Sequence, residues 1–218
     1  MKYRDYLKRL KPILDKRDEY MFFSINKVLQ TSINRSVLKD RAIIYKDNSE
    51  VWEAKFNNYC DRDIASMFKF TFVRNPWDKT VSFFFYYKRI GDSIVQGFGS
   101  FDEFVCKLLK KGGVNLDAHL EMQYPKVYFQ DKKFLDYIGR FENASEDWVV
   151  VAKTINAPES LPHDNKTRHK HYSDYYSPQS VKVIADIYKK DINAFGYSFV
   201  TKKTKFLDLP FIELILRK

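Results

Sequence analysis

The sequence predicts an α/β protein with three layers, in which a central, mostly parallel sheet is flanked by helices. Short apolar runs typical of buried strands alternate with segments whose apolar residues recur at helical spacing, which is the order expected for parallel βαβ units. The 218 residues suffice for one packed domain, and they contain no internal repeat and no low-complexity linker. We therefore expect a single domain over residues 1–218.

The N-terminal half is expected to contribute two strands. Apolar residues recur at helical spacing over residues 2–14, which predicts a helix inside an N-terminal helical extension over residues 1–19. The elements expected next are a strand over 21–25, a short helix over 32–38, a strand over 41–45, and a loop with one helix over 46–67.

The clearest strand and helix follow. Phe70, Phe72 and Val73 form an apolar run typical of a buried strand, and Pro76 stands where the first turn of a helix tolerates proline. The elements expected after this helix are a helix over 101–109 that ends at two glycines, a strand over 137–141, a helix over 145–155, one or two helices over 175–195, and a packing tail over 200–218.

Composition points to a packed globular protein with an anionic partner. Apolar residues make up 44% of the chain, aromatic residues 17%, and the formal net charge is +10, spread along the whole sequence. Cys60 and Cys106 are the only cysteines, which favours a reduced compartment and no structural metal. Residues 1–19 are too polar for a signal peptide, and no apolar run has membrane-spanning length, so we expect a soluble, cytoplasmic protein.

Arg74 and Ser82 form the first candidate phosphate site. Arg74 ends the predicted strand over Phe70–Val73, and Ser82 lies on the helix that follows. Open α/β sheets bind ligands at the edge where their parallel strands end. A guanidinium fork and a hydroxyl suit the oxygens of a phosphate.

Lys27, Thr31 and Ser32 form the second candidate site. A strand, a loop that contains lysine, and a helix that opens with Thr-Ser together place backbone N–H groups, hydroxyls and a positive charge around an anion. The segment is not a Walker A sequence, because GxxxxGK[ST] occurs nowhere in the chain.

Both elements resemble those of sulfotransferases that use 3′-phosphoadenosine 5′-phosphosulfate (PAPS). Arg-Asn-Pro at 74–76, with Ser82 eight residues after the arginine, resembles the 3′-phosphate element of that family. Lys27, followed by Thr31 and Ser32, resembles its 5′-phosphosulfate loop, although the family usually has small residues where this chain has Val28-Leu29-Gln30. The bulky loop leaves open a family member with impaired catalysis.

Later segments extend the resemblance over roughly residues 20–199. His119 and Gln123 are similar to the His-x-x-x-Gln element of carbohydrate sulfotransferases, which makes that branch the nearest. The other similar segments are 138–143 with Asp147-Trp148, Asn165–Arg168, Tyr175-Tyr176 and Asp191–Tyr197.

The resemblance implies a P-loop-NTPase-like sulfotransferase fold and sulfuryl transfer from PAPS to an acceptor hydroxyl, with 3′-phosphoadenosine 5′-phosphate (PAP) as product. The acceptor would be a carbohydrate, and no metal would be needed. Lys27 would stabilise the departing 5′-phosphate, which Thr31 and Ser32 would hold. The residues implied for the 3′-phosphate are Arg74 and Ser82, with Lys166 or Arg168 as a further contact.

The acceptor hydroxyl needs a general base whose pKa is near neutral, which favours histidine. His119 is the preferred residue because it lies in the element that resembles the family's. Some sulfotransferases use a carboxylate instead, so the alternatives are Glu121, Asp117, Glu53 and Asp61.

Two activities of other classes fit part of the sequence. A basic nucleic-acid-binding module would explain the charge, but no reader motif is present, so we expect no nucleic-acid partner. A P-loop-like kinase would share the fold, but the chain lacks a Walker A motif and an evident carboxylate for Mg²⁺. The sequence alone leaves the identity of the acceptor and the oligomeric state open.

Overall fold

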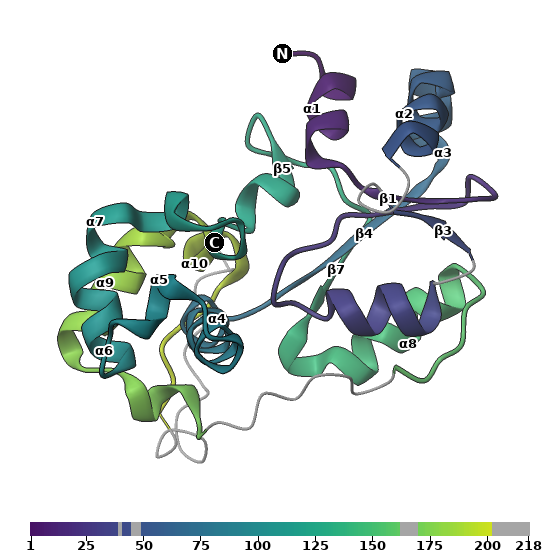
Figure 1. Cartoon of the computed structure of the whole chain (residues 1–218). Coiled ribbons are helices and arrows are strands. Elements are labelled where there is room, and N and C mark those ends of the chain that lie inside the picture. Colours follow the sequence, from purple (N-terminus) through teal and green to yellow (C-terminus); the bar gives the residue numbers. More distant parts are fainter. Residues whose placement is uncertain (39–40, 45–48, 162–169, 202–218) are drawn as a thin grey trace, which may run out of the picture.

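A mixed five-stranded sheet lies at the centre of the molecule (Figure 1). The computed structural model describes residues 1–38, 41–44, 49–161 and 170–201. The strand order is β3-β1-β2-β4-β7, in which β2, β4 and β7 are parallel and β1 is antiparallel to both of its neighbours. The strands are β1 (Ile13–Asp15), β2 (Tyr20–Phe22), β3 (Ala42–Ile43), β4 (Phe68–Val73) and β7 (Tyr137–Arg140).

The prediction of a mostly parallel sheet is therefore wrong. The sequence pattern did not reveal β1, which forms a hairpin with β2 and pairs Ile13 with Phe22. The Asp15 carboxylate closes the hairpin turn by accepting hydrogen bonds from the N–H groups of Arg17 and Glu19. A connection this short joins strands only in the antiparallel sense.

The helix expected over residues 2–14 is also too long. Helix α1 spans Tyr3–Leu10 and ends at Lys11, which adopts the left-handed conformation with φ of 48°. Pro12 follows and cannot donate the next helical hydrogen bond. Leu14 fits the helical pattern but lies in β1, fully buried in the core.

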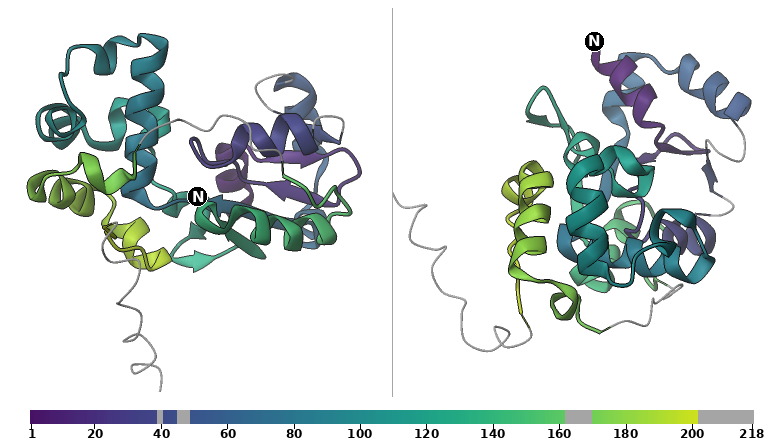
Figure 2. Two further views of the ribbon diagram at one scale, coloured as in Figure 1. Left: turned by 90° about the horizontal axis from the view of Figure 1, so that it is seen from below. Right: turned by 60° about the vertical axis from the view of Figure 1, so that its left-hand side comes forward.

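Helices cover both faces of the sheet. Helices α1, α2 (Ser49–Asn58) and α3 (Asp61–Ser66) lie on one face, and η1 (Ser32–Val37) and α8 (Ala144–Thr154) lie on the other (Figures 1 and 2). This arrangement confirms an α/β protein whose sheet is flanked by helices. The apolar side chains of the sheet and of these helices form one continuous buried cluster.

Helix α4 (Pro76–Ile90) leaves the sheet and organises a second buried cluster. Its start is fixed locally, because the Asn75 side chain accepts a hydrogen bond from the N–H of Trp77, and Pro76 needs no partner there. The helices that contribute to this cluster are α5 (Ser93–Gln96), α6 (Phe101–Phe104), η2 (Val105–Leu109) and α9 (Pro178–Ile187), which surround α4 away from the sheet (Figure 2).

Short elements connect the two clusters. They are α7 (Lys110–Gly112), η3 (Gly113–Leu116), η4 (Ala118–Leu120), η5 (Tyr124–Lys126), a small hairpin of β5 (Tyr128–Phe129) and β6 (Lys132–Lys133), η6 (Phe141–Asn143), η7 (Tyr172–Tyr175) and α10 (Lys189–Phe195). None of the helices in the described part of the chain is both long and apolar enough to cross a bilayer. The tail expected over 200–218 lies outside the described residues after Thr201.

The contact between β4 and β7 requires glycine at position 139. Gly139 pairs with Phe72, and a Cβ at position 139 would lie 2.3 Å from Cε1 of that ring. Phe72 is buried and packs near Trp148 of α8, so the ring has little room to move.

We expect Gly139→Ala to lower the free energy of unfolding by about 1–3 kcal/mol through overpacking. Chemical denaturation would measure this change. Gly97→Ala is the matched control, because Gly97 has a negative φ and no neighbouring atom where a Cβ would stand. Equal stability of the two variants would contradict this account of the β4–β7 contact.

Candidate active site

The two candidate phosphate elements meet at one edge of the sheet. β2 and β4 are parallel neighbours, and the chain leaves β2 toward Lys27 and β4 toward Arg74. Nη1 of Arg74 donates a hydrogen bond of 2.9 Å to the carbonyl oxygen of Lys27. The structure thus brings the two elements into direct contact.

The loop from Ser24 to Thr31 is tightly folded. Its two ends are fastened by the Phe23 N–H, which donates to the Phe70 carbonyl, and by the Ile33 N–H, which donates to the Leu29 carbonyl. Lys27 and Leu29 both adopt left-handed backbone conformations, with φ of 65° and 51°.

The bulky residues of this loop pack against the sheet. Val28 is buried in the apolar cluster of the sheet, and Leu29 packs against it. The left-handed residues on either side of Val28 reverse the chain locally, so that Val28 occupies the core. The core of the fold therefore accommodates Val28 and Leu29, which are larger than the residues usual in the corresponding loop of the family.

The ammonium of Lys27 lies over an aromatic ring and next to other cations. Its Nζ is 3.9 Å from the centre of the Tyr86 ring, which is a cation–π contact. Burial, followed by the positive charges of Arg74 and Arg89, lowers the pKa of Lys27 to about 8. Within the described residues, no carboxylate forms an ion pair with this ammonium.

One face of α4 supports the Lys27 loop. Asp78, Ser82 and Tyr86 are spaced four residues apart, so they follow one another along the same face of the helix. Arg74 contacts this face at one end, where its Nε donates to Asp78 Oδ2 at 2.9 Å. Lys27 therefore spans the face, with its carbonyl at Arg74 and its ammonium at Tyr86, and Ser82 lies between them.

Several contacts fix the orientation of the Arg74 guanidinium. Besides its bonds to Asp78 and Lys27, its Cζ lies 3.9 Å from the centre of the Phe141 ring. No described residue accepts a hydrogen bond from Nη2, so its two N–H groups are among the donors that remain for a ligand. Ser82 is only 3% exposed. Its burial restricts how a ligand that binds beside the Lys27 loop can reach the Ser82 hydroxyl.

The other predicted donor residues follow the loop or lie outside the structure. Ser32 begins η1 and is buried, and Thr31 precedes it as a half-buried residue. Lys166 and Arg168 lie outside the described residues, so their predicted contact stays a prediction.

Gln123 fastens the turn after β4, a role that sequence reasoning missed. Its side chain accepts from the Arg74 N–H at 2.8 Å and donates to the Arg74 carbonyl at 2.7 Å. Its own N–H donates to the buried Asp191 carboxylate, which also accepts from the N–H of Tyr124. Burial raises the pKa of Asp191, although these N–H groups oppose the shift. The only sequence signal was the place of Gln123 in the His-x-x-x-Gln element.

Lys79 is a buried cation beside this arrangement. Its Nζ donates to the Glu121 carbonyl at 2.6 Å, and burial lowers its pKa to about 8, while the charges of Asp191 and Glu121 oppose the shift. Lys79 thus joins α4 to the segment that carries His119 and Gln123.

His119 belongs to a three-residue hydrogen-bonded group with Asp117 and Tyr87. Nδ1 of His119 lies 2.7 Å from Asp117 Oδ1 and 2.9 Å from the hydroxyl of Tyr87, which also donates to Asp117 Oδ2 at 3.0 Å. The group is next to the Lys27 loop, because the Asn26 side chain donates to the Ala118 carbonyl at 3.2 Å.

The Asp117 carboxylate is held in its ionised form. Burial would raise its pKa, but hydrogen bonds from the backbone and ring of His119 and from Tyr87 outweigh it and lower the pKa of Asp117. Burial and the bond to Asp117 raise the pKa of Tyr87, so its hydroxyl keeps its proton.

The remaining candidate bases lie elsewhere or point outward. Glu53 and Asp61 are exposed on α2 and α3, and α3 leads into the amino end of β4, opposite the edge that carries Lys27. Glu121 is exposed, and its carbonyl is bound by Lys79. Only Asp117 and His119 are tied to the Lys27 loop through Ala118.

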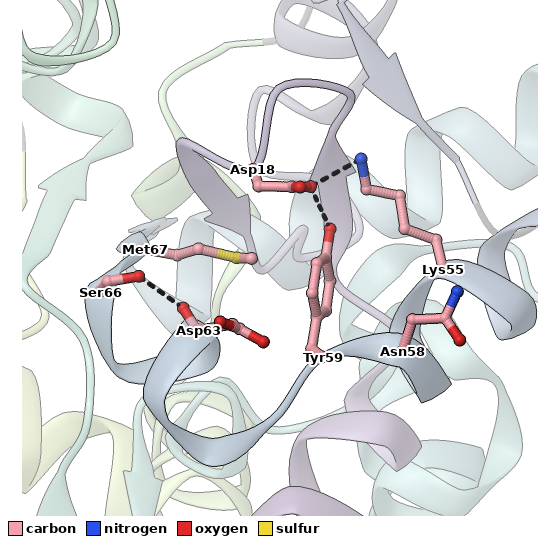
Figure 3. Close-up of a pocket in the computed structure, with 7 residues that line it drawn as sticks. All are labelled: Asp18, Lys55, Asn58, Tyr59, Asp63, Ser66 and Met67. Atoms are coloured by element: carbon pink, nitrogen blue, oxygen red, sulfur yellow. Dashed lines mark hydrogen bonds and ion pairs between the residues drawn. The ribbon is translucent and has the colours of Figure 1, made fainter.

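Neither Lys27 nor Arg74 lines either of two pockets among the described residues. The first, of about 590 Å³, lies at the amino ends of β2 and β4, where Asp18 pairs with both Lys55 and Tyr59 at 2.6 Å (Figure 3). The charges of Asp18 and Lys55 in this pocket therefore pair with each other. The second, of about 550 Å³, lies between α1 and residues 114–126, and Asp117 and Ala118 line it.

Comparisons with known proteins agree with this geometry. The fold and the site define an α/β protein with clustered cations at the carboxyl edge of its parallel strands. Residues 7–198 match the Sulfotransferase family, so the chain belongs to that family, which supports a transferase activity. An uncharacterized protein of Archaeoglobus fulgidus is 40% identical over 92 residues, which cover 42% of this chain and 70% of that protein. No solved structure matches the chain significantly.

The described residues contain no group of three or more histidine, cysteine, aspartate or glutamate side chains placed to hold a metal ion.

We expect Gln123→Ala to destabilise the protein by about 2–5 kcal/mol, because it leaves the buried N–H and carbonyl of Arg74 unpaired. Urea unfolding would measure the change. Gln96→Ala is the matched control, since the Gln96 side chain also bonds a backbone carbonyl but lies at the surface; it should cost no more than about 0.5 kcal/mol. Similar losses in both variants would show that Gln123 does not fasten the turn.

Proposed function

We propose that this protein transfers a sulfuryl group from PAPS to a hydroxyl of a carbohydrate acceptor. The observation that carries the proposal is the hydrogen bond between Arg74 and the Lys27 carbonyl. It holds the Lys27 loop against Arg74 at one sheet edge, which supports the binding of a single nucleotide whose phosphates at both ends would each meet a cation. The carbohydrate acceptor rests on the resemblance of the His119–Gln123 segment to the carbohydrate branch.

The residues present fit such a donor. A bisphosphorylated nucleotide needs several positive charges, and Lys27, Arg74 and Arg89 are close enough to affect one another's electrostatics. Lys27, Thr31 and Ser32 would hold the 5′ end. Arg74, through Nη2, and Ser82 would hold the 3′-phosphate, with Lys166 or Arg168 completing this contact.

The chain's own groups divide the work of an in-line transfer. PAPS supplies an activated sulfuryl group whose leaving group is a phosphate. Lys27 neutralises the negative charge that develops on this phosphate, in a site that holds the ammonium in place beforehand. His119 accepts the proton of the attacking hydroxyl. Positioning and charge stabilisation supply most of the catalysis, as in phosphoryl transfer.

We expect PAP to stabilise the protein more than AMP or ATP does, because only PAP carries both a 3′- and a 5′-phosphate. At 100 times its Kd, PAP adds about 2.7 kcal/mol, a rise in Tm of about 5–10 °C for a chain of this size. Ser82→Ala should reduce the shift with PAP but not the smaller shift with AMP. Ser93→Ala, at an exposed serine of α5, is the control and should change neither shift. Equal shifts with PAP and AMP would contradict the proposal.

Consumption of PAPS would separate this activity from its rivals. Sulfuryl transfer should persist in a metal chelator, whereas a kinase that depends on Mg²⁺ would stop. Nucleic-acid binding that falls steeply with salt, without selectivity for PAP, would favour the nucleic-acid-binding alternative.

We also expect PAP binding to weaken as the pH rises. The pKa of Lys27 in the free protein is about 8, so the ammonium that attracts phosphate is mostly present at pH 7 and mostly lost at pH 9. If only the charged form binds, the affinity falls about tenfold between these values. Calorimetric titration would measure it, with Lys27→Arg as the control, since arginine stays charged. An equal fall in that variant would assign the titration to another group, such as Lys79.

A further inference from the structure

We propose that Asp117 and Tyr87 are positioning residues that hold His119 in the tautomer with its proton on Nδ1, so that Nε2 is the atom that takes the acceptor's proton. This inference rests on the proposed sulfuryl transfer and resolves which member of the group acts as the base. The inference rests on the Asp117 carboxylate. One of its oxygens contacts the imidazole of His119, and the other accepts a hydrogen bond from the hydroxyl of Tyr87.

Each oxygen of Asp117 has a defined partner. Oδ1 accepts from the backbone N–H of His119 at 2.7 Å and lies 2.7 Å from Nδ1 of the same residue. Oδ2 accepts from the Tyr87 hydroxyl at 3.0 Å. The side chain of His119 is therefore fastened to its own backbone through Asp117, and Asp117 is fastened to α4 through Tyr87.

These partners determine which nitrogen carries the proton. An ionised carboxylate accepts hydrogen bonds only, so Nδ1 of His119 must be the donor in the contact with Oδ1. The Tyr87 hydroxyl gives its proton to Oδ2, and its oxygen, 2.9 Å from Nδ1, shares the same Nδ1 proton. The lone pair of the neutral ring is then on Nε2, to which no described residue donates.

Asp117 itself is poorly suited to act as the base. Its hydrogen bonds lower its pKa, and both of its oxygens are engaged. As an anion beside Nδ1, it stabilises the imidazolium that forms when Nε2 takes a proton, which is the role of the carboxylate in a Ser-His-Asp triad.

The position of the group relative to Lys27 supports a joint role. Tyr86 contacts the Lys27 ammonium and Tyr87 contacts His119, so consecutive residues of one helical turn locate the two groups. The Asn26–Ala118 bond holds the two loops together from the other side. A proton acceptor and the cation for the leaving group are thus fixed to the same short piece of α4.

The decisive variant is Asp117→Asn, which keeps the shape and leaves an oxygen for the backbone N–H of His119, so that its NH2 group faces the Tyr87 hydroxyl. That hydroxyl then loses its acceptor and is free to donate to Nδ1, which favours the other tautomer. With PAPS and a series of 4-nitrophenyl glycosides as acceptor probes, we expect kcat to fall on the order of 10²-fold or more, with the KM for PAPS unchanged. Tyr87→Phe should lower kcat about fivefold to tenfold, the effect of one hydrogen bond. The kcat of His119→Ala defines the effect of losing the base completely. Adding Asp117→Asn to that variant should lower kcat little further.

Asp131→Asn is the matched control, because Asp131 also accepts from a tyrosine hydroxyl, that of Tyr124, at an exposed site away from His119. It should leave kcat unchanged. A kcat of Asp117→Asn within threefold of the unaltered protein, while His119→Ala is impaired, would overturn the inference. The inference would also be overturned if Asp117→Asn lowered kcat by the same factor in the His119→Ala background, where the imidazole is already absent.

A readout without substrate separates this inference from the proposed function. The ¹⁵N chemical shifts of the His119 ring distinguish the two tautomers, and we expect Nδ1–H in the unaltered protein and Nε2–H in Asp117→Asn. A protein that binds no PAP but shows this change would refute sulfuryl transfer and retain the positioning role. If Asp117→Asn does not fold, Nε2–H in the unaltered protein, or an unchanged kcat in Tyr87→Phe, still overturns the inference.

Discussion

The hydrogen bond from the Arg74 guanidinium to the Lys27 carbonyl is the contact on which the rest of the site depends. It exists because β2 and β4 are adjacent and parallel, so that the loops after them leave the sheet side by side. Gln123 fixes the backbone of Arg74, and Asp78 and Phe141 fix its side chain. The left-handed conformation of Lys27 is thereby held against a rigid neighbour.

This arrangement brings the positive charges of Lys27 and Arg89 together, and no carboxylate among the described residues forms an ion pair with either. Nζ of Lys27 and Cζ of Arg89 lie 3.9 Å and 5.4 Å from the same Tyr86 ring centre, so they are at most the sum of these distances, about 9 Å, apart. The ring attracts both cations but cannot cancel their charge, and burial together with the charges of Arg74 and Arg89 lowers the pKa of Lys27. A multiply charged anion would relieve this repulsion, so the electrostatic cost in the free protein favours ligand binding.

The sequence predicted the parts of the structure that local chemistry determines. The strand, Pro76 in the first helical turn and the helix itself follow from short-range preferences, and the structure confirms them. It missed β1, because three residues are too few for a strand pattern and Leu14 continues the helical spacing of α1. The mixed sheet follows from that omission.

The partners within the site were harder to predict for a different reason. Gln123 and Asp191 meet across 68 residues of sequence, and nothing local in either segment indicates the pairing. Asp117 and His119 are two residues apart, but the sequence does not show which atoms face each other, so Asp117 was interpreted as a competing base. Whether residues lie close can be inferred from the order of strands, whereas their hydrogen bonds depend on tertiary packing.

Helix α4 connects these observations, because its side chains contact several parts of the site. Asp78, Ser82 and Tyr86 lie beneath the Lys27 loop, Tyr87 contacts His119, and Lys79 is buried against the segment around Glu121. The first turn of the helix is capped by Asn75, whose own N–H donates to Glu142 after β7. Because a helix is stiff over this length, a shift of α4 would displace the groups for the leaving phosphate and for the acceptor's proton together. The packing of aromatic side chains around α4 therefore sets the geometry on which the proposed transfer depends.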